Sequence, residues 1–445
     1  MKKFILLILF YEFLFAQTGI KEAWEMVEQN SDAIKASKDS TTIATLKKKS
    51  AKSMYLPSIS ITGSYTHLSE PIGIDTHGIA GSLPSTSIVG TIMSALPNHQ
   101  LDFSEQDVFL ADLHMLWPLY TGGKIDAAQD IYAAAADEAK AMAQMKKDEE
   151  FLKLVKYYYG VVVASSLYET RKEAQKALKL HYQNAKKLKE QGQIANIELL
   201  DAKVKFDGAK IETTKAKHKY EIAVSALTTL LKQKIEPSSK FVINETPKEQ
   251  EYYQTQTEQN YAGLGIFDAK EKQTNALVGV KKSGYYPTVM GYANYSLYKD
   301  DSPLMQTLPQ WFAGVRVKID ILKRKDREQE IQIAKLLNSK VKHLKTQALE
   351  NLAILVEKTY KEMESYKEEY NSLSSSLALA KENYRLRTIA FKEGLSTSVE
   401  VVNAQMFLLG AKTKRLNAAY NYEQKLSQLC VLSGDRDMFF EIIGR

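Results

Sequence analysis

The stretch YLPSISITGSYTHL, residues 55–68, and the later stretch YYPTVMGYANYSLY, residues 285–298, decide the fold. In both, apolar and polar side chains alternate as they do in a β-strand, although the chain around them is rich in Lys and in helix-favouring residues. Three residues of the first stretch recur in the second at one offset of 230: Tyr55 as Tyr285, Pro57 as Pro287 and Tyr65 as Tyr295. This constant spacing indicates an internal duplication.

A second pair of stretches repeats at an offset of 202 residues. GQIANIELLDAKVKFDGAK begins at Gly192, and GLSTSVEVVNAQMFLLGAK begins at Gly394. The two offsets differ by 28, so the first copy holds about that many extra residues between the two landmarks. The extra residues fall between Leu68 and Phe109, and each copy therefore reads as strand, loop, strand.

The predicted strands are residues 58–67, 109–118, 288–297 and 311–321, each near the 9 to 11 residues that a tilted strand needs to cross a bilayer. Apolar residues such as Leu113 and Val315 share one parity, while Asp112, His114, Arg316 and Lys318 occupy the other. Aromatic residues cluster at the strand ends, as in interfacial girdles. The alternative is a small sheet covered by helices in a soluble protein. There the face that carries Arg316 and Lys318 would be buried, and these charged side chains would be hard to pair.

The ten prolines of the chain lie outside residues 124–233 and 322–432. Those two spans predict helical hairpins that turn at Gly192 and Gly394. A helix from Lys124 to Glu190 would be about 100 Å long at 1.5 Å per residue. No globular core needs helices of that length, and shorter helices are expected around 20–53 and 260–283.

Four strands cannot close a barrel, and an open sheet edge is not viable in lipid. Several chains must therefore share one barrel, and the fold class predicted is mainly α with a membrane β-barrel. Three chains would give a trimeric barrel of twelve strands, with the long helical hairpins forming an α-helical tunnel below it. In domain terms, residues 17–445 form a single duplicated domain. Repeat 1 covers about 17–233, a linker covers 234–256, and repeat 2 covers about 257–433.

The N-terminal stretch MKKFILLILFYEFLFAQ has a basic start, an apolar run and a small residue at Ala16. It predicts a cleaved signal peptide at residues 1–16, with a membrane anchor as the alternative. The lone cysteine, Cys430, rules out a disulfide within one chain and has the helical spacing of a core residue.

The formal charge of +7 comes from Lys and Arg that are interleaved with Asp and Glu along the helical stretches. This pattern is typical of a solvated helix surface rather than of a nucleic-acid footprint. The sequence contains no catalytic constellation and no GxxxxGK, so it predicts neither an enzyme nor a cofactor. Four histidines near the first strand pair (His67, His77, His99 and His114) are too loosely spaced to predict a metal site.

The paired YLP and YYP strand starts, the strand-to-helix turn WPLYTGGKIDAA and the tip EGLSTSVEVVNAQ together resemble the TolC family of outer-membrane efflux and secretion channels. The likeness covers essentially the whole mature chain. It implies a homotrimer in outer-membrane lipid with a long periplasmic extension. It also implies two partners, a periplasmic adaptor (membrane fusion) protein and an inner-membrane transporter.

Candidate site residues lie just after the two tip glycines. Glu198 and Asp201 share a helix face, and Glu400 and Asn403 hold the matching positions of the second copy. In the TolC family, acidic residues at the second-copy positions line the narrow periplasmic entrance, and the resemblance carries that gating role most directly to Glu400. Asn403 stands where the best-known members have a second Asp. The alternative is that these residues only complement the helix dipole.

The predicted function is a passive exit duct of the outer membrane. It would serve a tripartite efflux pump for drugs, toxic small molecules or metals, or type I protein secretion, with an inner-membrane partner as the energy source. The alternative is a secreted coiled-coil structural or adhesive protein without a pore.

Overall fold

The computed structural model describes residues 18–75, 88, 100–238, 241–243, 247–321 and 326–444. The predicted signal peptide, residues 1–16, lies outside this part. The chain divides into two compact units, considered one at a time below. The helical unit comprises Met1–Ile43, Ala136–Ala269 and Val341–Arg445, and the sheet unit comprises Ala44–Ala135 and Lys270–Lys340.

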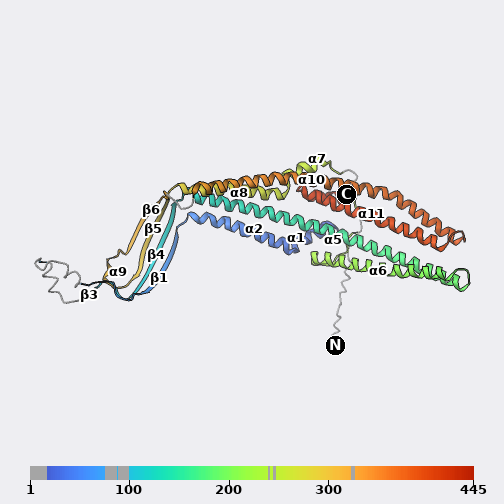
Figure 1. The fold of residues 1–445 in the computed structure, drawn as a ribbon, viewed down its shortest axis with the longest axis horizontal. Coiled ribbons are helices and arrows are strands. Elements are labelled where there is room, and N and C mark those ends of the chain that lie inside the picture. The colour runs from blue at the N-terminus through green and yellow to red at the C-terminus, as the bar shows by residue number, and fades with distance from the viewer. Residues whose placement is uncertain are drawn as a thin grey trace, which may run out of the picture. The chain divides into compact units, whose positions relative to one another are not determined.

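Within the described residues, the sheet unit holds a four-stranded antiparallel sheet in the order β1-β4-β5-β6 (Figure 1). Its strands are β1 (Ser58–His67), β4 (Asp107–Tyr120), β5 (Thr288–Lys299) and β6 (Trp311–Lys318). The four predicted strands are confirmed, although β4 is two residues longer at each end and β6 ends earlier than expected. Short elements also occupy the two loops, β2 (Gly73–Asp75) with β3 (Gln100–Asp102) in the first and α9 (Pro303–Thr307) in the second.

The strand register collects the apolar side chains on one face of the sheet. One row across the four strands is Ile59, Met115, Ala293 and Ala313, and the next is Ile61, Leu113, Tyr295 and Trp311. The outer members of these rows are strongly exposed, with Ile61 at 70% and Trp311 at 65%. The opposite face is more polar and carries Ser60, His114 and Asn294, although their row ends at Phe312 on β6. The predicted assignment of the two parities to two faces is confirmed.

The repeated tyrosine at each strand start ties a strand to a long helix. Helix α5 (Lys124–Glu190) follows β4, and α10 (Arg327–Lys392) follows β6. The Tyr55 hydroxyl donates to Asp126 Oδ1 at 2.8 Å, and the Tyr285 hydroxyl donates to Glu328 Oε2 at 3.3 Å. The two copies therefore place the same hydrogen bond at the junction between strand and helix.

Gly122 makes the turn from β4 into α5 possible. It has φ +65°, and a Cβ there would lie 2.7 Å from Tyr286 Cβ and 2.9 Å from the Ser283 carbonyl oxygen. Both the left-handed conformation and the lack of space require glycine.

The helical unit contains two antiparallel hairpins, in which α6 (Asn196–Leu231) runs beside α5 and α11 (Ser398–Leu432) runs beside α10 (Figure 1). Gly192 and Gly394 have φ +72° and +75°, so both predicted tip turns are confirmed. The backbone N–H of Gln193 donates to the Leu188 carbonyl, and that of Leu395 donates to the Ala390 carbonyl. These are Schellman bonds, which end a helix at a glycine.

Shorter helices complete the helical unit. They are α1 (Ile20–Asn30), the first part of α2 (Asp32–Ala51), α7 (Gln250–Asn260), the first part of α8 (Ala262–Lys282) and α12 (Asp437–Ile443). Helix α7 begins inside the segment 234–256 that was expected to be a linker. Tyr253, in α7, is fully buried in the core, which explains why this part of the segment folds as a helix.

An aromatic cluster in the core joins helices from both ends of the sequence. The Phe151 ring, on α5, makes edge contacts with Trp24 at 5.4 Å, Phe439 at 5.5 Å and Phe440 at 5.6 Å between ring centroids. Cys430 is fully buried in the same core, so its predicted core position is confirmed. Burial of these side chains stabilises each helix more than its intrinsic propensity does.

No helix among the described residues contains a stretch that is both long and apolar enough to span a membrane.

Glu423 is a carboxylic acid with no exposed surface in the helical unit. Its Oε1 accepts a hydrogen bond from the Val242 backbone N–H at 3.1 Å, and its Oε2 has no partner among the described residues. Burial raises the pKa of Glu423 from its ordinary 4.5 to about 8. Between pH 4.5 and about 8, Glu423 keeps its proton in the folded chain but loses it in the unfolded chain. The free energy of unfolding therefore falls as the pH rises towards 8.

We expect Glu423→Gln to flatten this pH dependence, because the amide keeps the acceptor for Val242 and cannot ionise. The measurement is the melting temperature of the purified protein from about pH 5 to about pH 8.5. Glu369→Gln, at an exposed position of α10, is the matched control and should follow the parent protein. An equal fall in melting temperature for the parent and for Glu423→Gln would contradict the assignment.

Candidate functional site

The tip of the second hairpin is built around the N-terminus of α11. Thr397 is the N-cap residue, and its hydroxyl accepts the Glu400 backbone N–H at 3.3 Å. In return Glu400 Oε2 accepts the Thr397 backbone N–H at 2.9 Å. This reciprocal capping box satisfies two backbone donors that the helix itself leaves unpaired.

Two more groups of the same hairpin reach the Glu400 carboxylate. The Ser396 hydroxyl donates to Oε2 at 2.7 Å, and Arg387 Nη1 lies 3.1 Å from Oε1. The Thr397 backbone N–H, the Ser396 hydroxyl and the Arg387 charge together hold the pKa of Glu400 below its ordinary value. Glu400 therefore stays ionised at mildly acidic pH, with its charge partly compensated inside the chain.

The tip of the first hairpin is capped differently. Its N-cap residue is Ala195, which has no side-chain acceptor. Glu198 is exposed, and its carboxylate has no ion-pair partner in the described part of the chain. Asp201 Oδ2 pairs with Lys205 Nζ at 2.8 Å, one turn further along α6. The tips thus share one backbone turn but carry different electrostatics.

The structure places all four candidate residues within the first two turns of α6 or α11. Glu198 and Asp201 lie on α6, while Glu400 and the exposed Asn403 lie on α11. No hydrogen bond or ion pair joins Glu198 to Glu400 among the residues described. Their role at an entrance therefore stays a prediction.

Arg387 is a site residue that sequence reasoning missed. It precedes Glu400 by 13 positions and lies on the other side of the tip turn. Helical spacing predicts pairs three or four residues apart within one helix, but it is silent about pairs across a hairpin. The register of α10 against α11 creates this ion pair.

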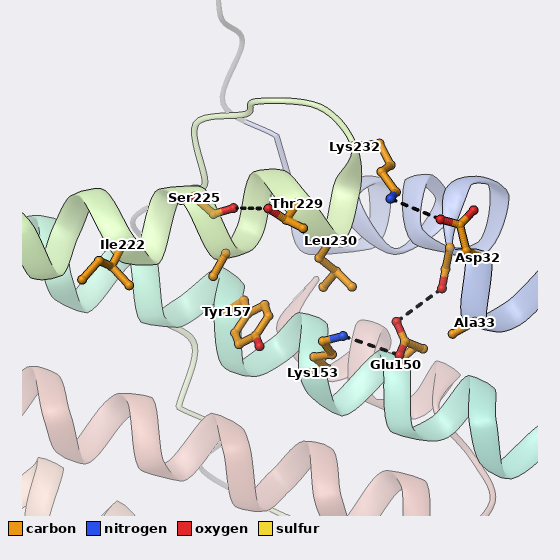
Figure 2. Close-up of a pocket in the computed structure, with 12 residues that line it drawn as sticks. Asp32, Ala33, Glu150, Lys153, Tyr157, Ile222, Ser225, Thr229, Leu230 and Lys232 are labelled. Atoms are coloured by element: carbon orange, nitrogen blue, oxygen red, sulfur yellow. Dashed lines mark hydrogen bonds and ion pairs between the residues drawn. The ribbon is translucent and has the colours of Figure 1, made fainter.

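A separate pocket of about 520 Å³ lies in the helical unit, where the joint between α1 and α2 meets α5 and α6 (Figure 2). Glu150 is 3% exposed there, and its Oε2 accepts the Ser31 hydroxyl at 3.3 Å while its Oε1 lies 3.7 Å from Lys153 Nζ. Lys232 Nζ and Asp32 Oδ2 form a second ion pair at 3.2 Å. Figure 2 shows both ion pairs on the wall of the pocket.

The second copy lacks the charged residues that line this pocket in the first copy. At the offset of 202, Leu352 and Leu355 stand where Glu150 and Lys153 stand in the first copy. The charged groups that line the pocket already have partners: Glu150 accepts the Ser31 hydroxyl and lies near Lys153, and Asp32 pairs with Lys232. We therefore interpret this pocket as the joint between short and long helices in the first copy.

The histidines of the first strand pair do not converge in the part of the chain that is described. His67 Nδ1 lies 2.7 Å from Asp107 Oδ1, and His114 is on the polar face of β4. His77 and His99 lie outside the described residues. Within these bounds no group of three or more His, Cys, Asp or Glu side chains is arranged to hold a metal ion.

Comparison with known protein families finds one match that covers most of the chain. The model of a family described as "Outer membrane efflux protein" matches residues 24–232 and 255–435. No curated protein matches the sequence significantly.

Solved structures of several channels share the fold. The outer membrane channel CmeC of Campylobacter jejuni is 16% identical with a TM-score of 0.75, and the match covers 94% of this chain and 86% of that one. CusC, whose structures concern transmembrane channel formation, is 12% identical with a TM-score of 0.74 over 95% and 93% of the two chains. The open state of the Neisseria gonorrhoeae channel MtrE is 15% identical with a TM-score of 0.72 over 94% and 89%.

The asymmetric capping of the two tips leads to a prediction about local stability. We expect Thr397→Ala to lower the free energy of opening of the first turn of α11 by about 1 kcal/mol, because one backbone donor loses its acceptor. Ala195→Thr should have the opposite effect and raise the free energy of opening of the first turn of α6. Amide hydrogen exchange of the two turns is the measurement.

Thr413→Ala is the control for this experiment, because the Thr413 hydroxyl donates to the Leu409 carbonyl in the middle of α11 and caps nothing. It should leave exchange at residues 398–401 unchanged. Equal exchange of that turn in the Thr397→Ala variant and in the parent would show that the capping box is not formed in solution.

Proposed function

Because the chain belongs to the outer membrane efflux protein family, we propose that it is a passive exit duct of the outer membrane that completes a tripartite efflux pump or a type I secretion system. The family match over residues 24–232 and 255–435 is the observation that carries the proposal. The fold agrees with it, since the channels CmeC, CusC and MtrE share the fold of this chain over 94% or more of its length.

The working unit is a homotrimer in this proposal. Four strands per chain leave β1 and β6 as edges of the described sheet, and lipid offers no hydrogen-bond partner to an edge. Three chains would supply twelve strands and pair every edge. The exposed isoleucines and tryptophan of the apolar face would then contact lipid rather than water.

The driving force comes from partners. Because the sequence contains no phosphate-binding loop, an inner-membrane transporter supplies the energy and a periplasmic adaptor protein connects it to the duct. The cargo is a drug, another toxic small molecule, a metal ion or a secreted protein, and its selection belongs to the transporter. A secreted coiled-coil protein without a pore would leave the apolar face of the sheet in water.

We place the periplasmic entrance at the hairpin tips, with Gly192 and Gly394 in the turns and Glu198, Asp201, Glu400 and Asn403 around the opening. Arg387 and Lys205 compensate Glu400 and Asp201, so most of the uncompensated charge belongs to Glu198. A ring of three such carboxylates attracts cations and focuses their field.

Assembly in a membrane is the first test of this proposal. We expect the mature chain to be extracted from membranes only by detergent and to have the mass of three chains by light scattering after the detergent contribution is subtracted. In planar bilayers it should conduct ions. An elongated oligomer that needs no detergent and forms no channels would refute the duct.

The charge of the entrance has a separate test. Glu198→Gln with Glu400→Gln should lower the cation selectivity of the trimer in planar bilayers, because size is kept and charge is removed. Gln at position 400 still closes the capping box, so the tip keeps its fold. Asn403→Asp is the matched variant of opposite sign and should raise cation selectivity. Unchanged selectivity in both variants would remove these residues from the entrance.

A further inference from the structure

His181 joins the two hairpins close to their tips. It lies in the last three turns of α5 and is 7% exposed. Its Nδ1 lies 2.7 Å from the hydroxyl oxygen of Ser398, the first residue of α11. The polar contacts described above for Asp201 and Glu400 stay within one hairpin, whereas this one crosses from the first hairpin to the second.

The contact lies beside a cavity of about 770 Å³ between the hairpins, and both His181 and Ser398 are among its lining residues. Leu180 and Phe391, also on the cavity wall, remain 58% and 38% exposed. Side chains around the contact are thus not packed tightly against each other. A single hydrogen bond carries a larger share of the cohesion here than it does in the aromatic core.

The charges around His181 come from four helices. Lys205 and Asp201 face it from α6, Lys392 lines the cavity from α10, and the positive end of the α11 dipole lies at Ser398. On α5 itself, two lysines and one acidic residue that precede His181 also line the cavity, namely Lys176, Lys179 and Glu173. Glu400 is occupied by its cap and by Arg387. The surroundings of His181 are therefore positive on balance.

These surroundings disfavour a second proton on the imidazole. Burial lowers the pKa of His181 below its ordinary value, Lys205 lowers it further, and Asp201 opposes the change. The Ser398 hydroxyl can either donate to the neutral ring or accept from the charged ring, so protonation does not remove the hydrogen bond itself. The cost comes from a buried positive charge beside lysines and a helix N-terminus.

We propose that His181 is a positioning residue that holds the start of α11 against the first hairpin while it is neutral, and that its protonation loosens the entrance. The inference rests on the proposed duct with its entrance at the hairpin tips. A histidine released to water has a pKa of about 6.5, so the joined state loses stability as pH falls through that value. Glu400 remains ionised over this window and does not contribute to the change.

The experiment measures the open probability of the full-length trimer in planar bilayers at about pH 7.5 and about pH 5.5. The parent protein should open severalfold more often at the lower pH. His181→Gln can still bond to Ser398 but cannot gain a charge, so its open probability should be the same at both values. Ser398→Ala removes the hydrogen bond and should open more often than the parent at the higher pH.

His218→Gln is the matched control, because His218 is exposed on α6 and should leave the acid response intact. An acid response of parental size in His181→Gln overturns the inference, as does a parent protein whose open probability does not change with pH. In both cases the channels themselves are present, so the duct stands. A parent trimer that forms no channels at either pH overturns the duct and the inference with it.

Discussion

The backbone N–H and C=O groups at the two edges of the β1-β4-β5-β6 sheet impose the constraint that organises the rest of the molecule. In hydrocarbon each unpaired group costs several kcal/mol, so an apolar sheet with open edges is stable only when strands of other chains pair with it. With an even number of strands per chain, β6 of one chain can pair antiparallel with β1 of the next. Such head-to-tail contacts close into a ring when the rotation between chains allows it.

The sheet also fixes where the two long helices begin. Each strand pair ends at one long helix, α5 or α10, and the hydrogen bonds of Tyr55 and Tyr285 lie at equivalent positions of the two junctions. Helix α5 is then held by packing further along the helix, where Phe151 contacts aromatic residues of α1 and α12. Duplication supplies the repeated turn chemistry, and the non-repeated C-terminal helix completes the core.

The two copies differ where charge is concerned. The first copy has a buried Glu150 beside Lys153 and an uncapped tip at Ala195, whereas the second has leucines and a complete capping box at Thr397. A pseudo-symmetric duct can therefore have one hairpin that is held firmly and one that is held less firmly. Arg387 compensates, within one chain, the charge of Glu400, the residue to which the family resemblance most directly assigns a gating role.

The sequence alone determined the two long helical hairpins and the four strands of the main sheet, because these depend on short-range periodicity. The offset of 230 located the strand starts, the absence of proline bounded the hairpins, and Gly192 and Gly394 marked turns that require positive φ. Alternation also sorted the side chains of the strands onto two faces, since a strand has a period of two.

Only the tertiary structure decided which side chains meet between elements distant in the chain. The bond between His181 and Ser398, the burial of Glu423 under Val242 and the pairing of Arg387 with Glu400 all depend on the axial register of one helix or loop against another. A shift of one helical turn, about 5.4 Å, would separate each pair, yet such a shift would leave the hydrophobic pattern of every helix intact. Periodicity therefore predicts which face of a helix is buried, whereas packing selects the partner that each residue finds there.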